Sequence, residues 1–187
     1  DGEVFTRKTL WFESDSGVPK WYEEEDLRED FRIVNTYSMK MMKTRLEKSG
    51  NVMEFETDLS KEKAVPFEVV IFFLRKNLID IVQTKDYSFT LFLPLLALEL
   101  EEKGLPRSMS MIKMVAELKE KIKLETPLGR MKGRKILIFP QSGILRALLP
   151  REKTHFEFTF SADAPYHLLE FEVGETRHIL TQIYLKQ

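Results

Sequence analysis

The sequence of 187 residues contains no cysteine. A chain without thiols forms no disulfide, no thiolate zinc site and no iron–sulfur centre, and it has no cysteine nucleophile. Cysteine-free chains persist in oxidising and in reducing compartments. The absence is therefore compatible with export without showing it.

Long apolar runs are also missing. The longest stretches are Val69 to Leu74 and Phe89 to Leu98, and Thr90 and Pro94 interrupt the second. A membrane-spanning helix needs about 20 apolar residues, so we predict no transmembrane segment. The chain starts at Asp1 among charged residues and has no visible apolar leader, and we expect that a leader has been removed.

An excess of positive charge is absent as well. The chain has 29 Lys and Arg against 30 Asp and Glu, a net charge of −1, whereas general nucleic-acid binders are basic. One segment, from Arg107 to Lys135, is rich in cations but contains no aromatic residue for base stacking. The cations from which a nucleic-acid site could be built are Lys113, Lys119, Lys121, Lys123, Arg130, Lys132, Arg134 and Lys135. Glu117, Glu120 and Glu125 balance them, so the pattern favours solvent-facing positions of two strands over a nucleic-acid site.

Motifs for catalysis and metal binding are not present. The sequence lacks G-x-S-x-G, H-E-x-x-H and any glycine-rich phosphate loop. If the segments that contain His155, His167 and His178 are paired strands, those side chains lie too far apart to share a metal ion. We therefore predict a non-enzymatic protein with no metal and no cofactor.

Alternating apolar and polar residues dominate what is present. The alternation from Tyr37 to Leu46 slips at Met41–Met42, which indicates a β-bulge, and a turn at Ser49–Asn51 leads to a second strand, Met53 to Leu59. Alternation also predicts strands at Phe156 to Phe160 and from His167 to Val173. The last strand is expected at 177–185.

Three further segments are rich in apolar residues. Phe67 to Leu74, after Pro66, is the best helix candidate. Met109 to Lys123 contains helix formers but alternates, and we favour a strand. Leu96, Leu98 and Leu100 continue the alternation of the Phe89 strand, so they too are assigned to a strand.

These patterns predict a mainly β fold, with α+β left open. We expect one domain over residues 1–187, built as a curved antiparallel sheet, a half-barrel or a sandwich with one or two short helices. Whether residues 1–30 form a peripheral segment is left open.

Methionine and phenylalanine are unusually frequent, at 8 and 14 residues. Ordinary core packing explains such residues, but flexible methionines also line apolar binding surfaces. If the sheet is open and concave, its lining residues are expected to be Met39, Met41, Phe55, Phe89, Phe156, Phe158 and Phe171.

Two stretches carry a resemblance to a known family. Residues 120–135 contain Thr126-Pro127-Leu128-Gly129 between two strand-like segments, and residues 154–172 contain an aromatic strand followed by Asp163-Ala164-Pro165. Together they resemble a family of bacterial exported β-rich proteins of unknown function, with a T-P-A-G type of turn between strands. Leu128 replaces the small residue common there, and the first forty residues have no counterpart.

The resemblance implies an antiparallel sheet and a location in the periplasm or cell envelope. It implies no catalytic residues. By analogy, the fold is similar in outline to half-barrel carriers of lipids and lipoproteins. Our hypothesis is a non-enzymatic envelope protein that binds a lipid, an acyl chain or a protein partner on a concave face. The alternative is an assembly module of the envelope with a filled core and no small ligand.

Overall fold

The computed structural model describes residues 6–13, 18–38, 40–60, 62–84, 86–148, 151–173 and 176–180. The fold is mainly β, as predicted from the alternating sequence. The chain divides into two compact units, Asp1–Ala64 and Val65–Gln187, and each is described here by itself. The expectation of one domain over the whole chain stays a prediction.

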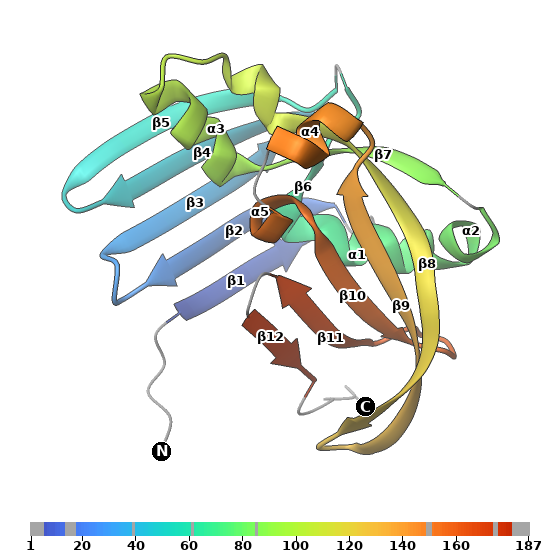
Figure 1. The fold of residues 1–187 in the computed structure, drawn as a ribbon. Coiled ribbons are helices and arrows are strands. Elements are labelled where there is room, and N and C mark those ends of the chain that lie inside the picture. The colour runs from blue at the N-terminus through green and yellow to red at the C-terminus, as the bar shows by residue number, and fades with distance from the viewer. Residues whose placement is uncertain are drawn as a thin grey trace. The chain divides into compact units, whose positions relative to one another are not determined.

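The first unit is a five-stranded antiparallel sheet whose strands follow one another in chain order (Figure 1). The strands are β1 (Thr6–Phe12), β2 (Pro19–Asp26), β3 (Phe31–Ser38), β4 (Met41–Lys48) and β5 (Asn51–Asp58). Tyr22, Asn35, Thr44 and Phe55 lie side by side across β2 to β5 on a buried face. Residues 6–26, whose place the sequence left open, supply the first two strands.

The predicted β-bulge at Met41–Met42 is wrong. β3 ends at Ser38 and β4 begins at Met41, and these two residues pair with each other. A change of phase between two strands joined by a short connection looks, in sequence, like a bulge within one strand. The predicted hairpin about Ser49 is confirmed, with Lys48 opposite Asn51.

The second unit is a curled seven-stranded half-barrel in the order β12-β11-β10-β9-β8-β7-β6. The strands are β6 (Val65–Pro66), β7 (Tyr87–Phe92), β8 (Met111–Thr126), β9 (Gly129–Pro140), β10 (Phe156–Ser161), β11 (Leu168–Val173) and β12 (Thr176–Ile179). The strands predicted at Phe89 and Phe156 are therefore confirmed. The strand predicted at Met109–Lys123 is confirmed from Met111 onward, whereas Met109 and Ser110 lie in a 3-10 helix. Residues 181–185 of the expected last strand lie outside the described residues.

Short helices connect the strands. They are η1 (Phe67–Val69), α1 (Val70–Lys76), α2 (Leu78–Gln83), α3 (Pro94–Glu102), η2 (Arg107–Ser110), α4 (Gly143–Leu148) and α5 (Arg151–Thr154). The helix expected at Phe67 to Leu74 is confirmed, but there are more helices than the one or two expected. Leu96, Leu98 and Leu100 lie in α3, so their assignment to a strand is wrong. Pro94 stands at the start of that helix, and burial of Pro94, Ala97 and Leu98 follows helical spacing.

Helices α1 and α2 supply part of the core of the half-barrel. Val70, Leu74, Leu78 and Ile81 are buried in one cluster with residues of β7, β8, β9 and β10. From η1, the Phe67 ring lies 4.9 Å from the Phe156 ring, centroid to centroid. The alternating apolar residues of the strands and the helical apolar residues thus meet in one packed interior.

Strands β8 and β9 form a hairpin longer than its neighbours. β7 pairs with β8 only from Met111 to Ala116, and β10 pairs with β9 only from Gly133 to Ile138. The far end of the hairpin therefore extends past the strands on both sides, as Figure 1 shows. We call residues 120–135 the hairpin arm, of which residues 133–135 still pair with β10.

Candidate functional site: a basic hollow on the hairpin arm

A β-bulge decides which side chains of β8 share a face with the core. Leu118 pairs with Ile136, but the next pair is Glu120 with Lys135, so Lys119 is an extra residue. Before the bulge, Leu118 shares a face with the buried Ile136 and Ile138. After the bulge, the alternation of β8 side chains between the two faces is reversed. Lys121 therefore lies on the same face of the sheet as Arg134, Ile136 and Ile138.

Four cations gather on this face as two successive cross-strand pairs. Lys121 lies opposite Arg134, and Lys123 lies opposite Lys132. Within the described part of the chain, none of these four side chains has an ion pair or hydrogen bond to another group. Like charges placed directly opposite each other destabilise an antiparallel sheet. The arm therefore contains two repulsive pairs that the described residues do not neutralise.

Arg134 is the most enclosed of the four. Its Nη1 atom is buried and has no hydrogen-bond partner among the described residues. Its Cζ atom lies 6.0 Å from the centroid of the Tyr166 ring, a cation–π arrangement. This guanidinium nitrogen therefore keeps an unused donor, although it is buried.

A hollow of about 530 Å³ lies beside these pairs. It is lined by Lys121, Ile122, Lys123, Lys132, Gly133, Arg134 and Ala162. Its volume falls within the range of about 300–1,000 Å³ that is typical of ligand pockets. We call this the basic hollow.

Glycine at position 133 lets β10 approach the arm closely. A Cβ atom at Gly133 would lie 2.7 Å from Thr159 Cγ2 and 3.4 Å from the Phe160 carbonyl oxygen. The loop after β10 closes the same side, where the Ala162 amide donates to the Lys132 carbonyl oxygen at 2.9 Å. Ser161 Oγ braces this loop by donating to the Asp163 carbonyl and accepting from the His167 amide. The wall of the basic hollow is thus a fixed part of the fold.

On the opposite face of the arm, the cations are neutralised. Lys135 Nζ lies 3.2 Å from Glu157 and 3.6 Å from Glu172, and Lys119 Nζ lies 2.5 Å from Glu157. Burial lowers the pKa of Lys135, but the hydrogen bond to Glu157 and the charges of Glu172 and Glu157 outweigh burial and raise it. Burial raises the pKa of Glu157, and the bonds to Lys119 and Lys135 outweigh that effect and lower it. The cations on this face are therefore paired with carboxylates, whereas those of the basic hollow are not.

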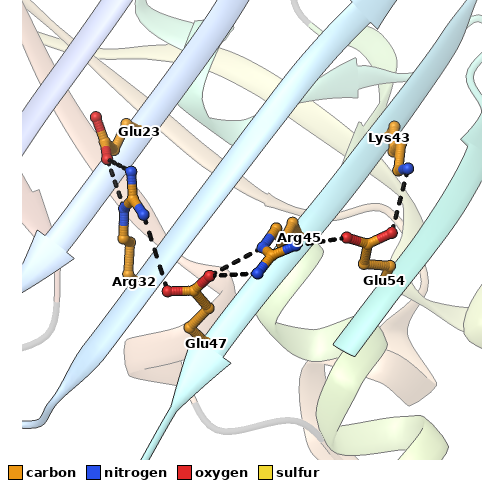
Figure 2. A network of polar contacts seen from close by, with 6 residues as sticks. All are labelled: Glu23, Arg32, Lys43, Arg45, Glu47 and Glu54. Carbon is orange, nitrogen blue, oxygen red and sulfur yellow. Dashed lines mark hydrogen bonds and ion pairs between the residues drawn. The ribbon is translucent and has the colours of Figure 1, made fainter. Parts of the chain in front are cut away.

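The charged face of the first unit is neutralised in the same way. Figure 2 shows a chain of contacts from Glu23 through Arg32, Glu47, Arg45 and Glu54 to Lys43. Arg45 lies 2.8 Å from Glu47 and 3.0 Å from Glu54, and its bonds to Glu47 and Glu54 raise its pKa. Each cation of this network has a carboxylate partner. The network therefore contains no unpaired positive charge that could bind an incoming anion.

The residues predicted to line a concave apolar face fall in different places. Met39 lies outside the described residues. Met41 is 36% exposed, and Phe55 is buried on the opposite face of the first sheet. In the half-barrel, Phe156 and Phe158 are buried in the packed core, and the Phe171 ring stacks on Phe158 with centroids 4.6 Å apart. Phe89 packs against the same core, and the centroid of the Phe89 ring lies 5.0 Å from that of the Phe73 ring.

The described ranges contain neither a metal-binding cluster nor a helix that could span a membrane. There, no cluster of three His, Asp or Glu side chains could hold a metal ion. None of the helices described is long and apolar enough to cross a membrane. The prediction of a non-enzymatic protein stays a prediction.

Comparison with protein families, with curated proteins and with solved structures finds no match for this chain. The resemblance to exported β-rich proteins, and the envelope location that it implies, are therefore predictions still. The evidence for function is the geometry of the chain itself.

Proposed function

We propose that this protein is a non-enzymatic binding module whose half-barrel unit holds a multiply charged anion in the basic hollow. The observation that supports the proposal is the pair of like-charged contacts, Lys121 with Arg134 and Lys123 with Lys132, on one face of the arm. The ligand class is an oxyanion with several charges, of the phosphate type. Such a group accepts hydrogen bonds from several donors at once.

Energetics favour occupancy by an anion. Each like-charged cross-strand pair costs roughly 0.2–1 kcal/mol, and a buried donor without a partner costs roughly 1–3 kcal/mol. A bound anion would remove the first of these costs, because it attracts all four cations. Arg134 supplies planar directed donors, whereas Lys121, Lys123 and Lys132 supply mobile point charges.

An acyl chain on the Phe-rich face, the ligand expected from the sequence, remains a hypothesis. In the half-barrel, Phe156, Phe158 and Phe171 pack on one another and on Phe67. An acyl chain would have to displace these contacts, whereas an anion needs no displacement in the basic hollow. The envelope location is also part of our proposal, supported by the resemblance of residues 120–135 and 154–172.

Isothermal titration calorimetry with tripolyphosphate tests the proposal. The test variant is the double substitution Lys121→Gln/Lys123→Gln, and the control is Lys76→Gln/Lys103→Gln, two exposed lysines of the same unit outside the arm. Both variants change the net charge equally. We expect binding by the native chain and the control, and a loss of up to about 25-fold in affinity for the test variant, since an exposed ion pair contributes up to about 1 kcal/mol, or about five-fold.

Binding should also weaken as salt is added, because the cations of the hollow are partly exposed. No measurable binding by the native chain would overturn the proposal. Equal affinities of the two double variants would overturn it as well, because they would show that net charge attracts tripolyphosphate to the protein without a specific site.

A further inference from the structure

We propose that the anions taken by the basic hollow are lipid headgroups, and that the hairpin arm docks on an anionic membrane surface with its tip foremost. This inference rests on the proposed function, because it uses the same four cations. It adds the physical form in which the phosphate groups are presented: a charged plane with an apolar layer beneath it.

The position of the arm makes such docking sterically simple. β8 has no strand partner on its β7 side beyond Ala116, and β9 has none on its β10 side before Gly133, among the residues described. The tip of the hairpin in Figure 1 therefore lies beyond the neighbouring strands of the half-barrel. A flat surface can therefore reach the tip before it meets the described strands β7 and β10.

The tip itself is apolar and exposed. It consists of Pro127 and Leu128 between Thr126 and Gly129, and Leu128 is 44% exposed. The Thr126 hydroxyl donates to the Gly129 carbonyl oxygen at 2.9 Å and accepts from the Leu128 amide at 3.2 Å. These two bonds fix the turn, so Leu128 is presented without a further ordering cost.

The cations follow this tip along the two strands, and their distances from Leu128 can be compared with the depth of a lipid headgroup layer. At about 3.3 Å per residue, Arg130 lies roughly 7 Å and Lys132 roughly 13 Å along the strand from Leu128. The headgroup layer on each side of a bilayer is roughly 5–7 Å deep, and the Debye length is about 10 Å at 0.1 M salt. If Leu128 enters the acyl boundary, Arg130 reaches the level of the phosphates, and Lys132 lies beyond that level by less than a Debye length.

The two faces of the arm differ in chemical character. Lys121, Lys123, Lys132 and Arg134 share one face, and Ile122, Leu124 and Met131 share the other. Arg130 is held by Glu125 at 3.3 Å, so the four unpaired cations lie further along the same face. Leu124 on the second face is buried, so the exposed apolar contribution to docking comes from Leu128 at the tip.

Nucleic acid would use the cations but not the tip. The arm has no aromatic side chain among its cations on which a base could stack, and an exposed leucine gains nothing against a phosphate backbone. The combination of Leu128 with the cations therefore favours a bilayer.

Vesicle co-sedimentation tests the inference. Protein is mixed with phosphatidylcholine vesicles, or with vesicles that contain equal amounts of phosphatidylcholine and phosphatidylglycerol. We expect binding to the second kind only. Lys121→Gln/Lys123→Gln should lower the partition coefficient about 25-fold, at about five-fold per cation. Leu128→Ser should lower it about ten-fold through lost apolar burial, with unchanged affinity for tripolyphosphate.

Leu105→Ser is the matched control. Leu105 is 43% exposed in the same unit, close to the 44% of Leu128, but lies outside the arm. It should leave both vesicle and tripolyphosphate binding unchanged. Far-ultraviolet circular dichroism checks that each variant keeps the fold.

The outcomes separate the two proposals. Binding of tripolyphosphate without binding of phosphatidylglycerol vesicles would overturn membrane docking and leave the proposed function standing. Binding of neither would overturn both. Docking would also fail if Leu128→Ser and Leu105→Ser bound vesicles equally well, or if a DNA oligonucleotide bound while the vesicles did not.

Discussion

Lys123 lies directly opposite Lys132 across the β8–β9 hairpin. Two residue pairs nearer the tip, Glu125 faces Arg130 and forms an ion pair at 3.3 Å. The two pairs occupy the same face of the same strands, so opposite charge would have been just as easy to place at the lysine pair. The unneutralised lysine pair is the observation on which the proposed anion site rests.

Lys123→Glu is expected to stabilise the free protein while it weakens anion binding. The substitution replaces a repulsive pair with an attractive one, and the free energy of unfolding should rise by about 1 kcal/mol. Urea unfolding measures this change, and added salt should reduce it. The exposed Lys103→Glu is the control and should change stability little. A Lys123→Glu protein less stable than the native one would contradict the assignment of the pair.

Gly133→Ala should destabilise the half-barrel by roughly 1–3 kcal/mol, because the new Cβ atom would meet Thr159 Cγ2 at 2.7 Å. Adding Thr159→Ser removes that methyl group. The loss in the double variant should therefore be smaller than the sum of the losses in the two single variants. Thermal unfolding of all three variants measures the coupling. Additive losses would show that Gly133 is needed for another reason.

Phe158→Ala should cost about 3–5 kcal/mol of unfolding free energy, since Phe158 is fully buried and stacked on Phe171. Phe72→Ala, at a ring that is 37% exposed on α1, is the comparison and should cost clearly less. Chemical denaturation of both variants decides whether Phe158 belongs to the packed core. A small loss for Phe158 would instead favour the open apolar face expected from the sequence.

Histidine 155 should make stability depend on pH. Burial, together with the charges of Arg151 and Arg146, lowers the pKa of His155 from its ordinary value of 6.5. Between the lowered pKa and 6.5, the unfolded chain binds more protons than the folded one, so stability rises with pH and is lost on acidification. His155→Gln should flatten this part of the profile. An NMR titration that gives His155 an ordinary or raised pKa would refute the expectation.

Much of the fold could be predicted from side-chain alternation. Phe156, Phe158 and Phe160 are two residues apart and all buried, which is the simplest signature of a half-buried strand. The same criterion failed at Leu96, Leu98 and Leu100, because leucine-rich helices also place leucines two apart. There, Pro94 at the start of α3 was the better signal.

The candidate site could be predicted only in part. The sequence marks the cations from Lys113 to Lys135 as a cluster, but it does not say which of them share a face. That depends on the bulge at Lys119, which reverses the alternation of β8 after Leu118. Without the bulge, Ile122 would share the face of Ile136 and Ile138, and Lys121 would lie on the other face. No motif marks this one-residue insertion, because register is a property of two strands together.

The most direct test of the account is an NMR titration of the amide-labelled protein with tripolyphosphate. The account predicts saturable shifts at the amides of the basic hollow, namely Lys121, Ile122, Lys123, Lys132, Gly133, Arg134 and Ala162. Exposed lysines elsewhere, such as Lys40, Lys76 and Lys103, should show no shift. Weak shifts spread over all exposed lysines, or no shifts at the arm, would contradict a binding site there.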